Sequence, residues 1–321
     1  MTLIMLLLGV GCTQSNTERA TTAKPLPQVG EVASTLSSEP EKIKVVTTFL
    51  PMYWFTKAVA GDAVDVEILV PPGTEVHEYQ ATPKNISEIA TARVLVKNGL
   101  GLEEFLEDII KNAQNPKLTV IDASRGIEPL DEISPVEKTS AVEEEHNHNH
   151  EHAEGNPHVW LDPVLVKQQV INIREGLIAA APANKAIYEA NAEAYIKQLD
   201  TLDNEFQKTL QKTPDCTFVT FHDAYPYLAK RYNIKQVAVV EIPEDQIVPA
   251  DVQNVVNAVK KYQAKALFGE PGIDNKLLTS LSKDLNLSLR PLDSLETGEI
   301  DPPYYFKAMK ANLQMLKSAC Q

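Results

Sequence analysis

Short apolar runs alternate with longer stretches of helical periodicity from about residue 44 to the C-terminus. The runs are rich in β-branched and aromatic residues and end at turn-forming residues, a pattern typical of buried strands. Strands are predicted at 44–49, 64–70, 94–97, 118–122, 217–221, 235–240, 266–269 and 287–292. Helices are predicted at 51–60, 83–90, 103–112, 164–180, 224–232, 249–262, 275–286 and 304–319. Since strand and helix alternate with short connections, we expect parallel sheets with helices on both faces.

One segment, 183–211, has no interior Gly or Pro and is rich in Ala, Glu, Lys, Leu and Gln. A helix of roughly this length would run about 40 Å, which is longer than one lobe needs. A free-standing coiled coil is the alternative, but heptads are not sustained along the segment. We therefore predict two α/β lobes with mostly parallel sheets, 42–181 and 213–321, joined by one long rigid helix within 182–212.

The N-terminal twelve residues form an apolar run that ends at Cys12, as in a bacterial lipoprotein signal. Two features depart from that pattern: no Lys or Arg precedes the run, and Gly9 stands where Leu is usual. A short buried helix is the alternative, and the run is too short to span a membrane. We expect lipidation at Cys12 and a flexible tether over 13–41, where Ser, Thr, Pro and Glu are frequent.

The net charge of the 321-residue chain is −14, and no basic block is present. This balance disfavours nucleic acid as a partner and favours the attraction of cations. Two further cysteines, Cys216 and Cys320, could form a disulfide in an oxidising envelope. Two free buried thiols are the alternative, and connectivity does not follow from sequence.

The chain has seven histidines, and four of them alternate with Asn or Glu in an acidic segment within 137–155: His146, His148, His150 and His152. Such a segment has little to bury, so we expect a mobile surface loop that binds metal weakly. A solvated spacer without metal binding is the alternative. The remaining three histidines are His77, His158 and His222.

These three histidines stand at positions where ligand-binding residues are expected. In open α/β sheets, ligands gather beyond the C-terminal ends of strands. His77 and His222 follow predicted strands, and His158 lies in a segment that two prolines constrain, NPHVWLDP. Glu270 and Asp293 also follow predicted strands. Each residue alone has an ordinary structural explanation, such as a helix cap for Asp293, but together they indicate a metal site in a cleft between the lobes.

Three imidazoles and one carboxylate match tetrahedral zinc. Imidazole also suits Cu, Ni and Fe, whereas Mn²⁺ prefers oxygen ligands. If a protein group holds the fourth position, the site is closed and serves for binding. If water holds it, the site resembles that of a zinc hydrolase, with Glu270 as the candidate general base. The residues alone leave both possibilities open.

Four motifs in this order, PGTEVHEY at 72–79, NPHVWLDP at 156–163, FHDAY at 221–225 and FGEP at 268–271, resemble a known family. It is the TroA-like, or cluster A-I, group of metal-binding solute-binding proteins of ABC importers. The resemblance covers about residue 42 to the C-terminus. The histidine-rich stretch before NPHVW resembles the zinc-uptake members of the group. The family fold has two α/β lobes, one long linking helix and a metal between the lobes.

The resemblance implies that His77, His158 and His222 are metal ligands. Manganese members commonly have a carboxylate where His222 stands, which favours zinc here. Asp293 matches a late aspartate that often completes the site, although the family more often has Pro where Ser294 stands. Glu270 resembles a carboxylate that orients a ligand imidazole.

The function that the resemblance implies is capture of Zn²⁺ outside the cytoplasm and its delivery to an ABC permease. The chain would be a monomeric, lipid-anchored receptor of the periplasm or cell surface, without enzymatic activity. The alternatives are a manganese or iron receptor of the same group, a three-histidine zinc hydrolase, and an adhesin-like surface protein.

Overall fold

The computed structural model describes residues 42–77, 79–130, 155–213, 216–240, 249–271 and 276–320. Several sequence-based expectations therefore lie outside the described residues. They are the signal at 1–12 with Cys12, the tether at 13–41, and the four histidines at 146, 148, 150 and 152.

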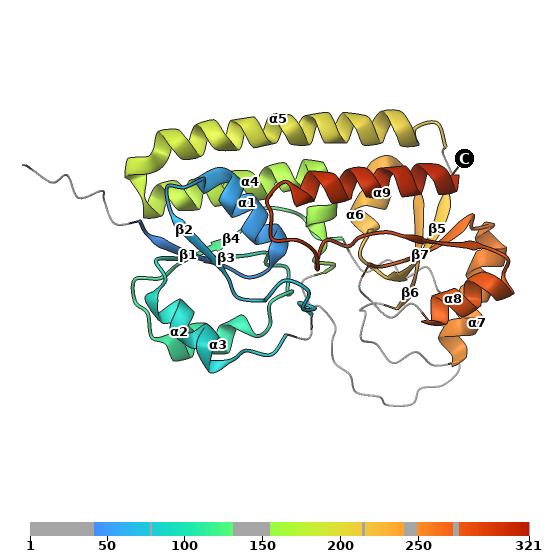
Figure 1. Cartoon of the computed structure of the whole chain (residues 1–321), viewed down its shortest axis with the longest axis horizontal. Helices are drawn as coiled ribbons and strands as arrows, with labels where there is room; N and C mark the ends of the chain where they lie inside the picture. The colour runs from blue at the N-terminus through green and yellow to red at the C-terminus, as the bar shows by residue number, and fades with distance from the viewer. Residues whose placement is uncertain are drawn as a thin grey trace, which may run out of the picture. The chain divides into compact units, whose positions relative to one another are not determined.

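The first sheet has four parallel strands in the order β2-β1-β3-β4 (Figure 1). Their bounds are Lys44–Thr47 for β1, Asp65–Ile68 for β2, Val94–Lys97 for β3 and Thr119–Asp122 for β4. Helices α1 (Leu50–Ala60) and α4 (Pro163–Ala180) lie above this sheet in the view, and α2 (Pro83–Thr91) and α3 (Leu106–Ala113) lie below it.

Alternation along the strands explains why both faces of the first sheet are covered. Val46 and Leu95 pack with Ile89 of α2 and Ile109 of α3. Their strand neighbours, such as Val45, belong to the cluster on the opposite face, with residues of α1 and α4. Strands buried on both faces read as continuous apolar runs, which is the pattern seen in the sequence.

The second sheet repeats this arrangement with the parallel order β6-β5-β7-β8. Its strands are Thr217–His222 for β5, Lys235–Val240 for β6, Ala266–Gly269 for β7 and Ser288–Pro291 for β8. Its helices are α6 (Pro226–Tyr232), α7 (Pro249–Tyr262), α8 (Lys276–Asp284) and α9 (Tyr304–Cys320). The two parallel-sheet lobes expected from the sequence are therefore confirmed.

Helix α5, Lys185–Leu210, is the expected long helix, with 26 residues. It runs alongside α1 and α4 of the first lobe and α9 of the second (Figure 1). Its buried Tyr188, Leu199 and Phe206 belong to one apolar cluster that also includes residues of both sheets, Val45 and Phe218. The helix thus shares a continuous core with both lobes, as the sequence predicted.

One local feature differs from the sequence-based expectation, and a second answers a question that the sequence left open. The helix expected at 103–112 begins only at Leu106, because the Glu103 carboxylate turns back and accepts the backbone N–H groups of Asn98 and Gly99 at 2.6 and 3.0 Å. Cys216 and Cys320 form a disulfide, with Cα atoms 5.4 Å apart, that joins the start of β5 to the end of α9. Among the described residues, none of the helices is both long and apolar enough to cross a membrane.

Candidate metal centre

His158 is held by its neighbour Asn156. The Asn156 Oδ1 accepts the His158 backbone N–H at 3.0 Å and lies 2.9 Å from the ring Nδ1. The Asn156 Nδ2 donates to the carbonyl oxygen of Asp223 at 2.8 Å, which fixes the orientation of the amide. Because an amide oxygen only accepts, the His158 Nδ1 carries the proton and its Nε2 keeps a free lone pair.

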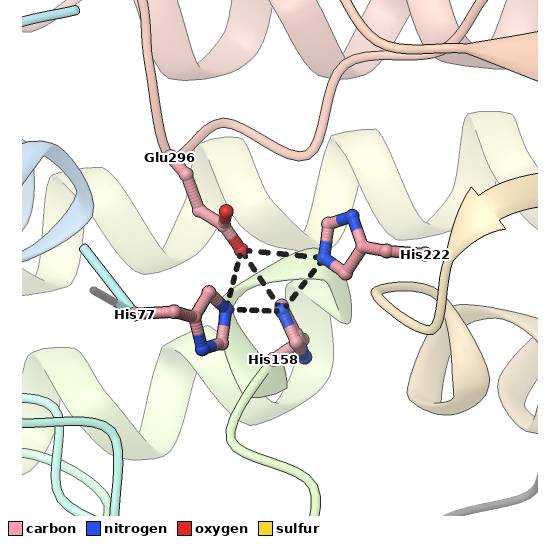
Figure 2. Close-up of side chains that lie close together, drawn as sticks. All are labelled: His77, His158, His222 and Glu296. Atoms are coloured by element: carbon pink, nitrogen blue, oxygen red, sulfur yellow. Dashed lines mark hydrogen bonds and ion pairs between the residues drawn. The ribbon is translucent and has the colours of Figure 1, made fainter. Parts of the chain in front are cut away.

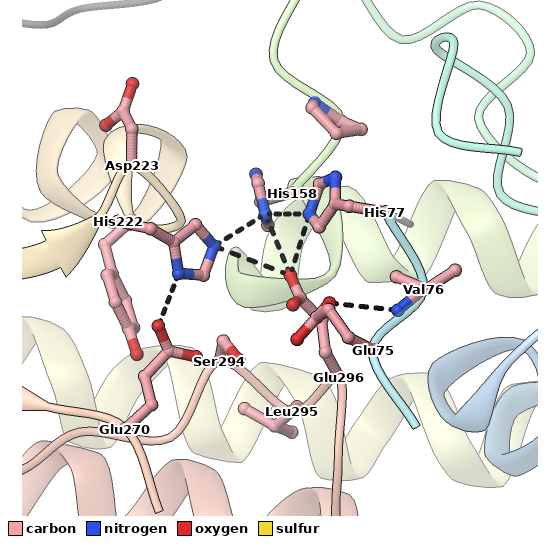
Figure 3. A network of polar contacts seen from close by, with 12 residues as sticks. Glu75, Val76, His77, His158, His222, Asp223, Glu270, Ser294, Leu295 and Glu296 are labelled. Atoms are coloured by element: carbon pink, nitrogen blue, oxygen red, sulfur yellow. Dashed lines mark hydrogen bonds and ion pairs between the residues drawn. The ribbon is translucent and has the colours of Figure 1, made fainter. Parts of the chain in front are cut away.

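His222 is the last residue of β5, and its side chain is fully buried. Its Nδ1 makes a short contact with Oε1 of Glu270, the residue that follows β7. Figure 3 shows Glu270 behind the ring, on the side away from the other histidines. A carboxylate in this place holds the Nδ1 proton and turns Nε2 toward the centre of the site.

His77 comes from the loop after β2, and its side chain is only 2% exposed. The preceding residue, Val76, is fully buried, and its backbone N–H donates to Glu75 Oε1 at 2.9 Å. This anchored turn presents the His77 ring to the other two histidines (Figure 3).

The three rings converge on one point (Figure 2). The Nε2 atom of His158 lies 3.3 Å from that of His77 and 3.1 Å from that of His222. The fourth member is Glu296, whose Oε1 lies 2.9 Å from His158 Nε2, 3.4 Å from His77 Nε2 and 3.7 Å from His222 Nε2. All four donor atoms lie within 4.8 Å of one another.

Glu296, and not the expected Asp293, completes this cluster. The Asp293 carboxylate instead accepts the Leu295 N–H at 2.8 Å and the Tyr304 hydroxyl at 2.7 Å. Both acids stand in the same Leu-Asp-Ser-Leu-Glu stretch after β8, so position after a strand did not separate them. An adjacent apolar residue does not separate them either, because Leu292 precedes Asp293 and Leu295 precedes Glu296, and both leucines are buried.

Burial and charge shift the pKa values of three of the four groups in different directions. Burial lowers the pKa of His158 to about 3, although Glu296 opposes this shift. Burial also lowers the pKa of His222, but the charges of Glu270 and Glu296 outweigh it and hold that pKa well above its usual value. For Glu296, burial is outweighed by His77 and His222, which hold its pKa well below the usual range. These shifts favour an ionised Glu296, a neutral His158 and a protonated His222.

The carboxylate of Glu296 is buried at the centre of the three rings. Although Oε1 lies close to His158 Nε2, neither of its oxygens has a hydrogen-bond partner among the described residues. Buried polar atoms in proteins are nearly always paired, and an exception commonly marks the place of an ion. Three inward-facing nitrogens and one buried carboxylate are a donor set that fits a divalent cation.

A family model described as "Zinc-uptake complex component A periplasmic", ZnuA, matches residues 45–319. The chain belongs to the ZnuA family. It is 34% identical over 292 residues to the high-affinity zinc uptake system protein ZnuA of Bacillus subtilis, covering 88% of this chain and 89% of that protein. It is also 34% identical to the zinc-binding lipoprotein AdcA of Streptococcus pneumoniae over 281 residues, which are 86% of this chain and 55% of AdcA.

Solved structures of the family share the fold. The crystal structure of the Zn(II)-bound ZnuA-like domain of Streptococcus pneumoniae AdcA matches with a TM-score of 0.72 and 31% identity. The match covers 87% of this chain and 99% of that domain. The resemblance expected from the four sequence motifs is thus confirmed at the level of family and fold.

Proposed function

We propose that this chain captures one Zn²⁺ ion with His77, His158, His222 and Glu296 and delivers it to the permease of an ABC importer. The observation that carries the proposal is the convergence of these four donor atoms within 4.8 Å at a buried place. The zinc-uptake relatives and the Zn(II)-bound AdcA domain support the same reading.

The donor set favours zinc over manganese. Three imidazole nitrogens and one carboxylate suit a borderline ion, whereas Mn²⁺ prefers oxygen ligands. The site also favours binding over catalysis. With four protein donors, a tetrahedral zinc ion keeps no position for a water nucleophile, unlike the three-ligand sites of zinc hydrolases. Glu270, the candidate general base of such a hydrolase, faces the Nδ1 of His222 instead.

The metal-free charge state supports uptake of a cation. Glu270 and Glu296 bring two carboxylates to the site, and the raised pKa of His222 reflects the proton that partly balances them. A zinc ion displaces that proton and adds a second positive charge beside Glu296. Zinc binding is thus expected to release the proton from His222.

The remaining parts of the proposal concern place and partners. The family description as a periplasmic component places the protein outside the cytoplasm. We propose a lipid anchor at Cys12, which the AdcA relative's name as a lipoprotein supports. The receptor would act as a monomer that presents its ion to a permease in the cytoplasmic membrane.

Native mass spectrometry with competing metal ions tests the proposal, because it reports the identity and the number of bound ions together. We expect one tightly bound zinc per chain. Replacing His77, His158 or His222 with Ala should weaken zinc binding at least about tenfold, or about 1.4 kcal/mol.

His150→Ala, outside the four-residue cluster, is the matched control and should leave the tight affinity unchanged. The proposal is wrong if all three cluster variants bind zinc as the wild type does. Steady turnover of ester or peptide substrates by the zinc-loaded protein would instead support the hydrolase.

A further inference from the structure

The segment that carries Glu296 is held from several sides. The Tyr225 hydroxyl donates to the Leu292 carbonyl oxygen at 2.9 Å, and the Trp160 indole N–H donates to that of Ser294 at 2.7 Å. Trp160 lies two residues after His158, so this bond ties the segment to the stretch that carries His158. Figure 3 shows Ser294, Leu295 and Glu296 in succession as the chain approaches the histidines.

Asp293 holds this segment through its backbone and its side chain. Its backbone N–H donates to Asn312 Oδ1 at 2.8 Å, and its carbonyl oxygen accepts from Asn312 Nδ2 at 2.7 Å. Its Oδ1 accepts the Leu295 N–H at 2.8 Å, and its Oδ2 accepts the Tyr304 hydroxyl at 2.7 Å. Asp293 thereby joins the loop after β8 to two residues of α9, Tyr304 and Asn312.

An unusual backbone angle lies beside the bond from Leu295 N–H to Asp293. A side-chain oxygen that accepts the N–H two residues later closes an Asx turn. Leu295 lies inside the turn region with φ of +65°, a left-handed conformation that a leucine rarely adopts. Its side chain is fully buried. The turn therefore needs support from outside Leu295, and it decides the direction in which the next residue, Glu296, leaves the backbone.

We propose that Asp293 is the positioning residue of the fourth zinc ligand, fixing the turn at Leu295 so that the Glu296 carboxylate meets the three histidines. The inference rests on the proposed function. It gives Asp293 a role in zinc binding without contact with the ion, since Asp293 lies outside the group of four donors and its oxygens accept from Leu295 and Tyr304.

A double-mutant cycle on zinc affinity tests this role. Asp293→Ala loses both side-chain contacts and should weaken zinc binding about tenfold, as is typical for residues that orient a metal ligand. Asp293→Asn should stay near wild type, because its Oδ1 still accepts from Leu295 and its Nδ2 can donate to the Tyr304 oxygen. In a Glu296→Ala background, Asp293→Ala should add less than about a twofold effect, because the ligand it positions is absent.

Cobalt gives a second readout, since its visible absorption reports the donors around the ion. The Co²⁺ spectrum of Asp293→Ala should shift toward that of Glu296→Ala, while Asp293→Asn keeps the wild-type spectrum. Tyr304→Phe removes one contact, and its smaller loss of affinity should likewise vanish in the Glu296→Ala background. It serves as the test should Asp293→Ala fail to fold.

The outcomes separate this inference from the proposed function. A wild-type protein that binds no zinc overturns the proposed function. Tight wild-type binding with an equal loss for Asp293→Ala in both backgrounds overturns the inference alone, because Asp293 then acts independently of Glu296, as a direct ligand would. Full affinity and an unchanged cobalt spectrum in Asp293→Ala also overturn it.

Discussion

The Glu270–His222 contact decides how protons compete with the metal. Asn156, which holds His158, is a neutral amide, and burial keeps the pKa of that ring at about 3. Glu270, which holds His222, is a carboxylate whose charge helps to raise the pKa of that ring well above its usual value. The two rings are similarly buried. Their pKa values therefore shift in opposite directions because one ring contacts an amide and the other a carboxylate. His222 therefore favours a proton that zinc must displace.

Zinc affinity should fall as pH drops through the neutral range. Below the raised pKa of His222 the metal-free ring holds a proton that zinc must release, so apparent affinity changes by about tenfold per pH unit. Glu270→Gln removes the charge that helps to raise this pKa. Its affinity should depend less on pH near neutrality, with the dependence moved to lower pH. Chelator competition across a pH series measures both slopes.

The exposed residue Glu128 provides the matched control for that experiment. Glu128→Gln makes the same chemical change away from the cluster and should keep the wild-type slope. An identical slope in Glu270→Gln would show that the proton released on binding is not governed by the Glu270–His222 contact.

At the scale of elements, the pattern of apolar and polar residues predicted the strands and helices whose bounds depend on that pattern. Strands at Val94–Lys97 and Ala266–Gly269 were predicted to the residue, because buried parallel strands are continuous apolar runs between polar turns. The predicted helix start at Glu103 was wrong. The Glu103 carboxylate accepts the backbone N–H of Asn98, and the spacing of apolar residues does not reveal such a contact. The sequence-based choice of Asp293 over Glu296 as the fourth ligand was wrong for a different reason. Residues distant in the sequence, such as Trp160, hold the segment in place, and these contacts could not be read from the local pattern.

The disulfide should stabilise the second lobe. It joins residues 104 positions apart, the start of β5 and the end of α9. Closing a loop of that length restricts the unfolded chain, so a Cys216→Ser, Cys320→Ser double variant should lose about 2–4 kcal/mol of unfolding free energy. Denaturant titration of the metal-free protein measures the loss.

The wild type under reducing conditions is the natural comparison and should lose a similar amount of stability. Neither cysteine belongs to the four-residue cluster, so the folded variant should still bind one zinc. An unchanged free energy of unfolding in both samples would show that the disulfide contributes little to the fold.

At the scale of the whole molecule, the site depends on both halves of the chain. His77 and His158 come from the first lobe; in the second lobe, His222 ends β5 and Glu296 follows β8. Bonds that cross between the halves surround the cluster. Asn156 donates to Asp223, and Arg231 of α6 forms an ion pair with Asp162 at 2.8 Å. The linking helix and these bonds tie together the two lobes that supply the ligands, which reduces the cost of bringing the ligands together.

A backbone hydrogen bond joins the residues on the two sides of the histidine-rich segment. The Asn156 N–H donates to the Leu130 carbonyl oxygen at 2.9 Å, so the residues on either side of 131–154 are bonded to each other. Gly155 makes this possible, because its φ is +84° and a side chain there would lie 2.8 Å from the Leu130 oxygen. The segment can therefore be shortened without removing the contacts that hold His158.

Deleting residues 142–153 should leave the tight site intact and remove weaker zinc binding. The deleted part contains all four alternating histidines, and ordering a chain around an ion costs about 1–2 kcal/mol per residue. Calorimetric titration should show one tight zinc in both proteins and additional weak equivalents only in the full chain. A full-length variant with these four histidines changed to Asn keeps the segment and should match the deletion. Loss of the tight site in either folded variant would show that the segment supplies a ligand to it, whereas identical titrations of all three proteins would make the segment a spacer.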